Sequence, residues 1–141
     1  MSVDVKYRTA ATANGGRDGR TRTEDGKLDL QLSTPKALGG AGGEGTNPEQ
    51  LFASGYAACF LSAMKFAAHE LNLQVPTGAA VTATVGIGMR SEGGFGLDVE
   101  LAVALPGVER NDAQRLVEAA HQTCPYSNAL RGHVDLRLGV I

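Results

Sequence analysis

The chain has 141 residues, 43% of them apolar, which suits one domain (1–141) with a core that needs no staples. Its formal net charge of −2 excludes a basic field that would attract nucleic acid or anionic lipid. The N-terminal segment MSVDVKYRTA does not resemble a secretory signal, and no run approaches the roughly 18 apolar residues of a membrane helix. We therefore expect a cytoplasmic protein with no nucleic-acid or membrane partner.

The first third of the sequence has strand patterns. Apolar and polar residues alternate over residues 3–7 and again over 28–32, and residues 20–23 can form a short strand between them. Asp25-Gly26 is a hairpin signal. This predicts a three-stranded meander with one apolar face, which another element must cover.

A long helix is predicted to begin at Asn47. Asn47 suits the N-cap, Pro48 the first helical position, and Gln50 the partner position of a capping box. The helix continues to about Asn72 and is apolar over most of its circumference. Such a helix is typically buried, and in so small a domain it indicates a subunit interface as well as a core.

The second half repeats the alternation of strands and helix. Strands are predicted over residues 81–89 and 94–105, joined by a hairpin, and over 134–140. Residues 109–121 form an amphipathic helix, which Pro125 stops or kinks. The predicted order is βββ-α-ββ-α-β, and the class is α+β with mainly antiparallel sheet.

The two cysteines, Cys59 and Cys124, lie 65 positions apart. In a reducing compartment such a pair is catalytic, redox-sensing or simply buried. Cys59 lies well inside the long helix, too far from its start for the helix dipole to lower the pKa, so a nucleophilic role requires a nearby cation. Cys124 lies at the end of the second helix, a mobile boundary position of the kind a resolving cysteine needs. The alternative for both is a small apolar core residue.

Arg17 and Glu49 are the candidate partners of a reactive thiol. Arg17 lies in a glycine-flanked loop that could aim a guanidinium at a thiol, although a solvated turn residue is the alternative. Glu49 lies in the first helical turn, where it complements the dipole or could orient the arginine. Ten residues separate Glu49 from Cys59, about 15 Å along one helix. If both serve one site, we expect Glu49 to come from a second subunit.

Three other kinds of functional site receive little support from the sequence. Residues 40–45 match G-x-G-x-x-G by letter, but they do not directly follow a strand in a βαβ unit, so a dinucleotide site is not expected. The three histidines and two cysteines lack zinc-ligand spacing. No Gly-x-Ser-x-Gly elbow is present.

Four segments carry a resemblance to a known family: GGRDGR at 15–20, TNPEQLFASGYAACF at 46–60, GGFGLDVEL at 93–101 and HQTCPYSNA at 121–129. Together they resemble the organic hydroperoxide resistance proteins of the osmotically inducible protein C superfamily. The resemblance implies an intertwined α+β homodimer in which two long central helices pack between sheets.

The same resemblance implies a thiol-dependent peroxidase that prefers organic, including lipid-derived, hydroperoxides. Cys59 would be the peroxidatic cysteine, Cys124 the resolving one, and Arg17 and Glu49 the activating pair. The resemblance implies no metal and no bound organic cofactor, with recycling by lipoyl-type dithiols from lipoylated proteins. The alternatives are a two-cysteine redox sensor or small-ligand binding dimer without turnover, and a structural protein with two inert thiols.

Overall fold

The computed structural model describes residues 2–141, which divide into two compact units, one ending at Pro48 and the other spanning Glu49–Ile141. The first unit is built on an antiparallel sheet of order β1-β2-β3, formed by β1 (Ala11–Asn14), β2 (Arg20–Thr23) and β3 (Asp29–Gln31). Two 3₁₀ turns, η1 (Gly16–Asp18) and η2 (Lys36–Leu38), connect its loops.

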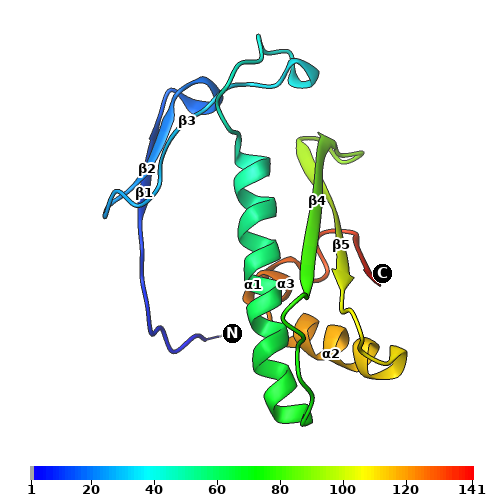
Figure 1. Cartoon of the computed structure of the whole chain (residues 1–141). Helices are drawn as coiled ribbons and strands as arrows, with labels where there is room; N and C mark the ends of the chain where they lie inside the picture. The colour runs from blue at the N-terminus through cyan, green and yellow to red at the C-terminus, as the bar shows by residue number, and fades with distance from the viewer. Residues whose placement is uncertain (1) are drawn as a thin grey trace. The chain divides into compact units, whose positions relative to one another are not determined.

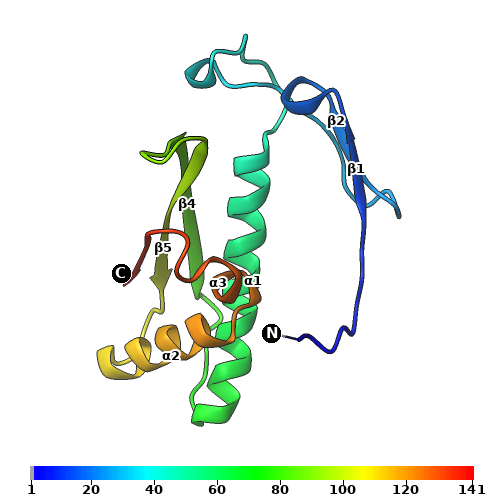
Figure 2. The ribbon, with the colours of Figure 1, turned by 180° about the vertical axis from the view of Figure 1, so that it is seen from behind.

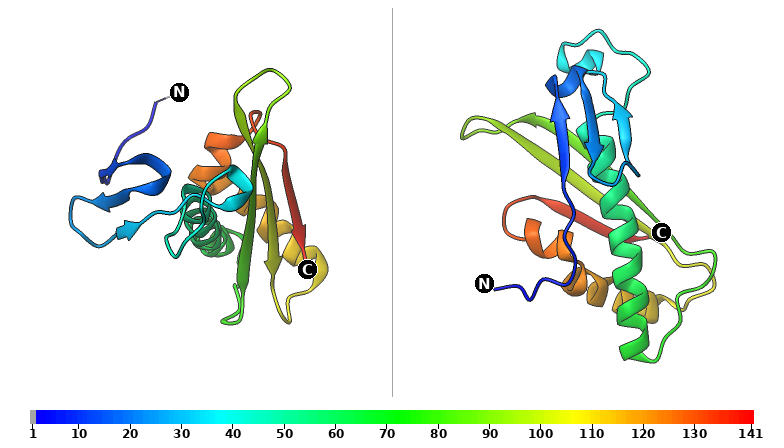
Figure 3. Two further views of the ribbon diagram at one scale, coloured as in Figure 1. Left: turned by 90° about the horizontal axis from the view of Figure 1, so that it is seen from above. Right: turned by 90° about the vertical axis from the view of Figure 1, so that its left-hand side faces the viewer.

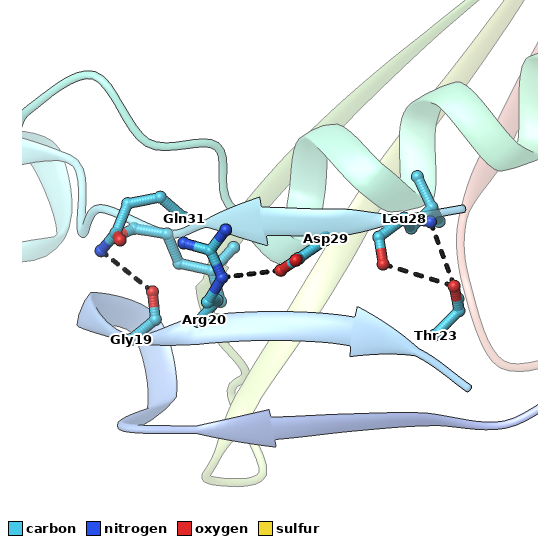
Figure 4. A network of polar contacts seen from close by, with 7 residues as sticks. Gly19, Arg20, Thr23, Leu28, Asp29 and Gln31 are labelled. Carbon is cyan, nitrogen blue, oxygen red and sulfur yellow. Dashed lines mark hydrogen bonds and ion pairs between the residues drawn. The ribbon is translucent and has the colours of Figure 1, made fainter. Parts of the chain in front are cut away.

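The β2–β3 hairpin forms where the sequence predicted it. Arg20 Nε donates to Asp29 Oδ1 across the two strands at 2.6 Å, and the Thr23 hydroxyl accepts from the Leu28 amide at 3.0 Å (Figure 4). In the turn, the Asp25 carboxylate accepts from the Lys27 amide at 3.0 Å, which leaves the backbone of the hairpin well bonded.

The predicted strand over residues 3–7 is wrong, because the first strand is β1. Ala11 pairs with Thr23, the last residue of β2, and one further bond joins the Glu24 amide to the Ala10 carbonyl. Residues 3–7 lie beyond the end of β2, and alternation alone cannot supply a hydrogen-bonded neighbour. Their apolar side chains are exposed by 72%, 47% and 78% at Val3, Val5 and Tyr7.

The second unit begins with α1 (Pro48–Leu71), close to the predicted bounds. One face of α1 is buried, at Tyr56, Phe60, Ala63, Met64, Ala67 and Ala68. The rest of the circumference is more open than predicted, and Phe66 is 62% exposed. By length and composition α1 could cross a membrane, contrary to the expectation from the sequence, since its best 18-residue window has a mean hydropathy of 1.3. The core helix of a soluble protein has the same property.

A second sheet has the order β4-β5-β6. β4 (Ala80–Met89) and β5 (Phe95–Ala104) form the predicted antiparallel hairpin. β6 (Leu136–Val140) pairs in parallel with β5. Parallel pairing requires a crossover, and the helices between β5 and β6 supply it. The side chains of Met89 and Phe95, opposite each other at the hairpin tip, are 73% and 68% exposed.

The crossover contains α2 (Arg110–Thr123) and a short helix, α3 (Pro125–Leu130). The sequence did not predict α3. α2 lies across α1, and α3 lies beside α1 (Figures 1 and 2). Figure 3 shows the second sheet from two further directions. Residues from α1, β5 and α2 form one core, which includes Phe60, Leu101 and Leu116. The fold is therefore mixed α+β with two small sheets, in the order βββ-α-ββ-α-α-β.

Candidate active site

Cys59 and Cys124 are brought together by α1 and the α2–α3 junction. Cys59 is half-buried on α1, next to the fully buried Phe60. Cys124 is both the last cap of α2 and the first cap of α3. Its amide donates to Ala120 O at 2.8 Å at the end of α2, and its carbonyl accepts from Asn128 N at 3.0 Å at the start of α3. Pro125 has no amide proton, so the helix breaks there and Cys124 faces inward.

The two sulfur atoms are 3.8 Å apart, and both thiols are free. Forming a disulfide from this position requires a movement of less than ~2 Å, because the bond itself is ~2.0 Å long. The exposed fraction of Cys124 is 0%. Cys124 lies at the boundary after α2, as predicted, and it is also a core residue already in contact with its partner. The mobility of this position stays a prediction.

The pKa of the Cys59 thiol is raised, mainly because burial disfavours the thiolate and then because Cys124 lies beside it. A hydrogen bond from the backbone amide of Tyr126 acts in the opposite direction and favours the thiolate. Within the second unit the net effect is to hold Cys59 protonated. A thiolate at neutral pH consequently requires a positive charge near the sulfur.

A hydroxyl pair lies one helical turn from the sulfur pair. The Tyr56 hydroxyl and Ser127 Oγ are 2.6 Å apart, and both residues are fully buried. Burial raises the pKa of Tyr56. Sequence reasoning missed Ser127, although its position three residues after Cys124 mirrors the position of Tyr56 three residues before Cys59.

Aromatic rings gather beside the sulfurs. The Tyr126 ring lies 5.9 Å from that of Phe52 and 5.7 Å from that of Tyr56. Gly55 allows this approach, since a β-carbon there would lie 3.1 Å from the Tyr126 hydroxyl oxygen. An apolar hollow of about 390 Å³ opens at this place, lined by Phe52, Pro125, Tyr126, Ala129 and Leu130.

Arg17 lies in η1 of the first unit. Gly15 and Gly16 have φ values of 75° and 59°, which confirms that glycine gives this loop a shape other residues rarely adopt. Asp18 fastens the turn, since its Oδ1 accepts from the backbone amide of Thr34 at 3.1 Å and from its hydroxyl at 2.8 Å. The loop that carries Arg17 is therefore held in a defined conformation by hydrogen bonds.

Glu49 lies in the first turn of α1, as predicted. The helix is unbroken from Pro48 to Leu71, so Glu49 and Cys59 of one chain are separated by about 15 Å along its axis. The structure thus brings the two cysteines together and does not bring Glu49 to the cysteine of its own chain. Among residues 2–141, no group of three or more His, Cys, Asp or Glu side chains could hold a metal ion.

An α+β chain with two contacting free thiols, one on α1 and one between α2 and α3, is a two-cysteine thiol protein. Comparison with known proteins shows which family of such proteins it resembles. Residues 40–139 match a family model described as OsmC-like protein. The organic hydroperoxide resistance protein of Xanthomonas axonopodis pv. citri is 55% identical over 134 residues, covering 95% of this chain and 94% of the relative.

Solved structures agree with the sequence comparison. An organic hydroperoxide resistance protein from Legionella pneumophila superposes with a TM-score of 0.91 at 47% identity, covering 97% of this chain and 98% of the other. Organic hydroperoxide resistance protein OhrB of Bacillus subtilis has a TM-score of 0.87 at 43% identity, covering 96% and 98%. The chain belongs to the organic hydroperoxide resistance family of OsmC-like proteins.

Proposed function

We propose that this protein is a thiol-dependent peroxidase that reduces organic hydroperoxides, including lipid-derived ones, to alcohols through Cys59 and Cys124. The observation that carries the proposal is a pair of free thiols 3.8 Å apart with unequal burial. The half-buried sulfur can meet a peroxide, while the buried sulfur is shielded from it. The names of the relatives support the substrate class.

The chemistry takes place in two steps at sulfur. The Cys59 thiolate attacks one peroxide oxygen and the O–O bond breaks; the other oxygen takes a proton and leaves as an alcohol, and Cys59 becomes a sulfenic acid. The Cys124 thiol then attacks that sulfur, an S–S bond forms, and the sulfenic hydroxyl leaves as water. Contact between the two sulfurs before reaction favours the second step.

An external dithiol, of the lipoyl type and carried by a lipoylated protein, completes the cycle. One of its thiolates attacks the Cys59–Cys124 disulfide to give a mixed disulfide. Its second thiol displaces the remaining protein sulfur, so both cysteines return to thiols and the dithiol leaves as a disulfide. The electrons thus come from the dithiol, and no bound cofactor or metal takes part. We propose that the cycle runs in the cytoplasm.

Arg17 is the proposed cation. The surroundings of Cys59 in the second unit raise its pKa, so a guanidinium near the sulfur is what a thiolate requires. Glu49 would orient that guanidinium, and its position about 15 Å along α1 from Cys59 supports a site shared between two copies of the chain. The exposed Phe66 on the central helix supports the same homodimer, because a second copy would bury it.

The apolar hollow beside Tyr126 suits the organic part of the substrate. Its lining is made of aromatic, proline and aliphatic side chains, which favour an alkyl or acyl chain over water. Tyr126 joins the hollow to the sulfur, since its backbone amide contacts Cys59. This supports a preference for organic hydroperoxides over hydrogen peroxide.

Consumption of cumene hydroperoxide with dihydrolipoamide as reductant tests the proposal, in wild type, Cys59→Ser and Cys124→Ser. We expect rapid turnover by wild type and no turnover by Cys59→Ser. In Cys124→Ser, Cys59 should be oxidised once by the hydroperoxide and should then turn over only slowly. One stoichiometric oxidation of wild type without cycling would identify a redox sensor instead. Thiols slow toward every hydroperoxide tried would overturn the proposal and leave Cys59 a core residue.

A further inference from the structure

Besides the contacts of Tyr126, two side-chain contacts at matched spacing join α1 to the segment that begins at Cys124. On α1, Tyr56 precedes Cys59 by three residues, and on the other segment Ser127 follows Cys124 by three residues. Tyr56 bonds Ser127 at 2.6 Å, and the two sulfurs lie 3.8 Å apart. The sulfur contact and the hydroxyl contact therefore form two successive links between the same pair of segments.

The hydroxyl link is the stronger of the two while both cysteines are reduced. A buried hydrogen bond between hydroxyl groups is costly to break, because neither group can find water in the core. A thiol contact of 3.8 Å is a weak interaction by comparison. Cys124 itself lies in a break between two helices, with a backbone that Pro125 releases from α2. The hydroxyl link is thus the buried side-chain hydrogen bond that ties the residues after this break to α1, beside the ring contacts of Tyr126.

We propose that Tyr56 and Ser127 are positioning residues that fix Cys124 against Cys59 for disulfide formation. This inference rests on the proposed peroxidase cycle and adds to it the device that sets the rate of its second step. The pair touches neither peroxide nor reductant. Its effect is on the distance and direction of the Cys124 sulfur, where a misplacement of ~1 Å can cost on the order of a hundredfold in rate.

The single and double variants distinguish the effect of the hydroxyl pair on stability from its effect on the position of Cys124. Ser127→Ala or Tyr56→Phe removes one hydroxyl and leaves the other buried and unpaired, so stability and positioning are both lost. The double variant Tyr56→Phe/Ser127→Ala removes both hydroxyls, so stability is largely recovered because no polar group is left unpaired. Positioning is not recovered, because the link remains absent.

The test follows the two oxidation steps separately, by rapid mixing of the reduced protein with cumene hydroperoxide and mass spectrometry of quenched samples. We expect the rate of sulfenic acid formation at Cys59 to stay within about twofold of wild type in all three variants. The rate of disulfide formation should fall at least ~10-fold in the double variant, as in the single ones. Sulfinic acid should accumulate at high peroxide, because a second peroxide oxidises the sulfenic acid before Cys124 reaches it.

Val103→Ala provides the matched control. Val103 is fully buried on β5, and its truncation costs stability without removing an atom of either link. It should keep the wild-type rate of disulfide formation. A double variant that resolves as fast as wild type would overturn the inference, and so would a Val103→Ala variant that resolves as slowly as the double variant.

A second measurement needs no peroxide, so it distinguishes failure of this inference from failure of the proposed function. Equilibration of the Cys59–Cys124 disulfide with dithiothreitol gives the effective concentration of one thiol toward the other. We expect the double variant to lower it ~10-fold, which corresponds to ~30 mV in reduction potential. An unchanged equilibrium would count against the positioning role, even for a protein that never reduces a hydroperoxide. A wild type that forms the disulfide readily yet consumes no hydroperoxide would sink the proposed function alone.

Discussion

At the scale of single residues, the two sulfurs are chemically unequal although they touch. Cys59 is half-buried and has a raised pKa, whereas Cys124 is fully buried at a helix break. Burial is the first cause of the raised pKa, and the nearby Cys124 sulfur is the next. Cys124 therefore affects the ionisation of Cys59 before any oxidant arrives.

Replacing Cys124 tests this coupling. In Cys124→Ala, the like-charge repulsion and the hydrogen bond that raise the pKa of Cys59 are both absent. The pKa of Cys59 should fall, so the midpoint of its alkylation rate by iodoacetamide should move to lower pH than in wild type. Labelled-peptide mass spectrometry assigns the reaction to Cys59 in wild type, where two thiols are present. A midpoint at the same or a higher pH would contradict the coupling.

At the scale of elements, Gly55 lets α1 and α3 approach closely. A glycine inside a helix costs ~1 kcal/mol relative to alanine, and here it makes room for the end of the Tyr126 side chain. That ring is 38% exposed, so its hydroxyl end can move aside for a methyl group at modest cost.

Gly55→Ala should therefore raise the free energy of unfolding by up to ~1 kcal/mol, measured by urea denaturation. The displaced Tyr126 ring should at the same time reshape the apolar hollow. KM for a bulky hydroperoxide such as cumene hydroperoxide should change more than KM for hydrogen peroxide. Equal changes for both substrates, or a loss of stability above ~1 kcal/mol, would argue against this role of the glycine.

Local signals in the sequence predicted most elements of the fold. Asn47-Pro48 marked the start of α1, and the turn after Met89 marked the β4–β5 hairpin, because caps and turns are properties of a few neighbouring residues. The strand expected at residues 3–7 failed, since a strand exists only beside a partner and β2 ends too early. α3 was missed because Pro125 was interpreted as a stop, although proline also suits a first helical turn.

The candidate site was less accessible to prediction than the fold. The 65-residue separation of Cys59 and Cys124 contains no information about their distance, which depends on how α2 returns the chain to α1. Only resemblance to a family paired them. The Tyr56–Ser127 bond had no sequence signal beyond matched spacing, and the roles of Arg17 and Glu49 stay predictions.

At the scale of the whole molecule, a Cys59–Cys124 disulfide would close a long loop. For a separation of 65 residues, the chain-entropy model gives ~4 kcal/mol of stabilisation, by restricting the unfolded chain. Oxidised protein should therefore unfold at a higher urea concentration than reduced protein. Cys124→Ser treated with the same oxidant is the control and should show no such increase. Equal midpoints for the oxidised and reduced wild type would indicate that closing the bond strains the fold by a similar amount.

The proposed dimer makes a prediction about shared sites. Mixed dimers of Glu49→Ala and Cys59→Ser chains combine an intact Cys59 on one chain with an intact Glu49 on the other. If each site draws on both chains, the mixed dimer should recover about half of the wild-type activity, while each parent is nearly inactive. Activity no higher than that of the parents, in a mixture shown by mass spectrometry to contain the mixed dimer, would mean that the site is not shared in this way.

The exposed methionine at the tip of the β4–β5 hairpin can report how much oxidant the protein has met. Met89 projects into solvent there with 73% of its side chain exposed, whereas Met64 is enclosed in the core. Oxidants convert accessible methionine to its sulfoxide, which adds one oxygen atom. The ratio of oxidised Met89 to oxidised Met64, measured by peptide mass spectrometry, should rise only when peroxide arrives faster than the thiols consume it. The molecule would thus keep a lasting record of the oxidant that escaped it.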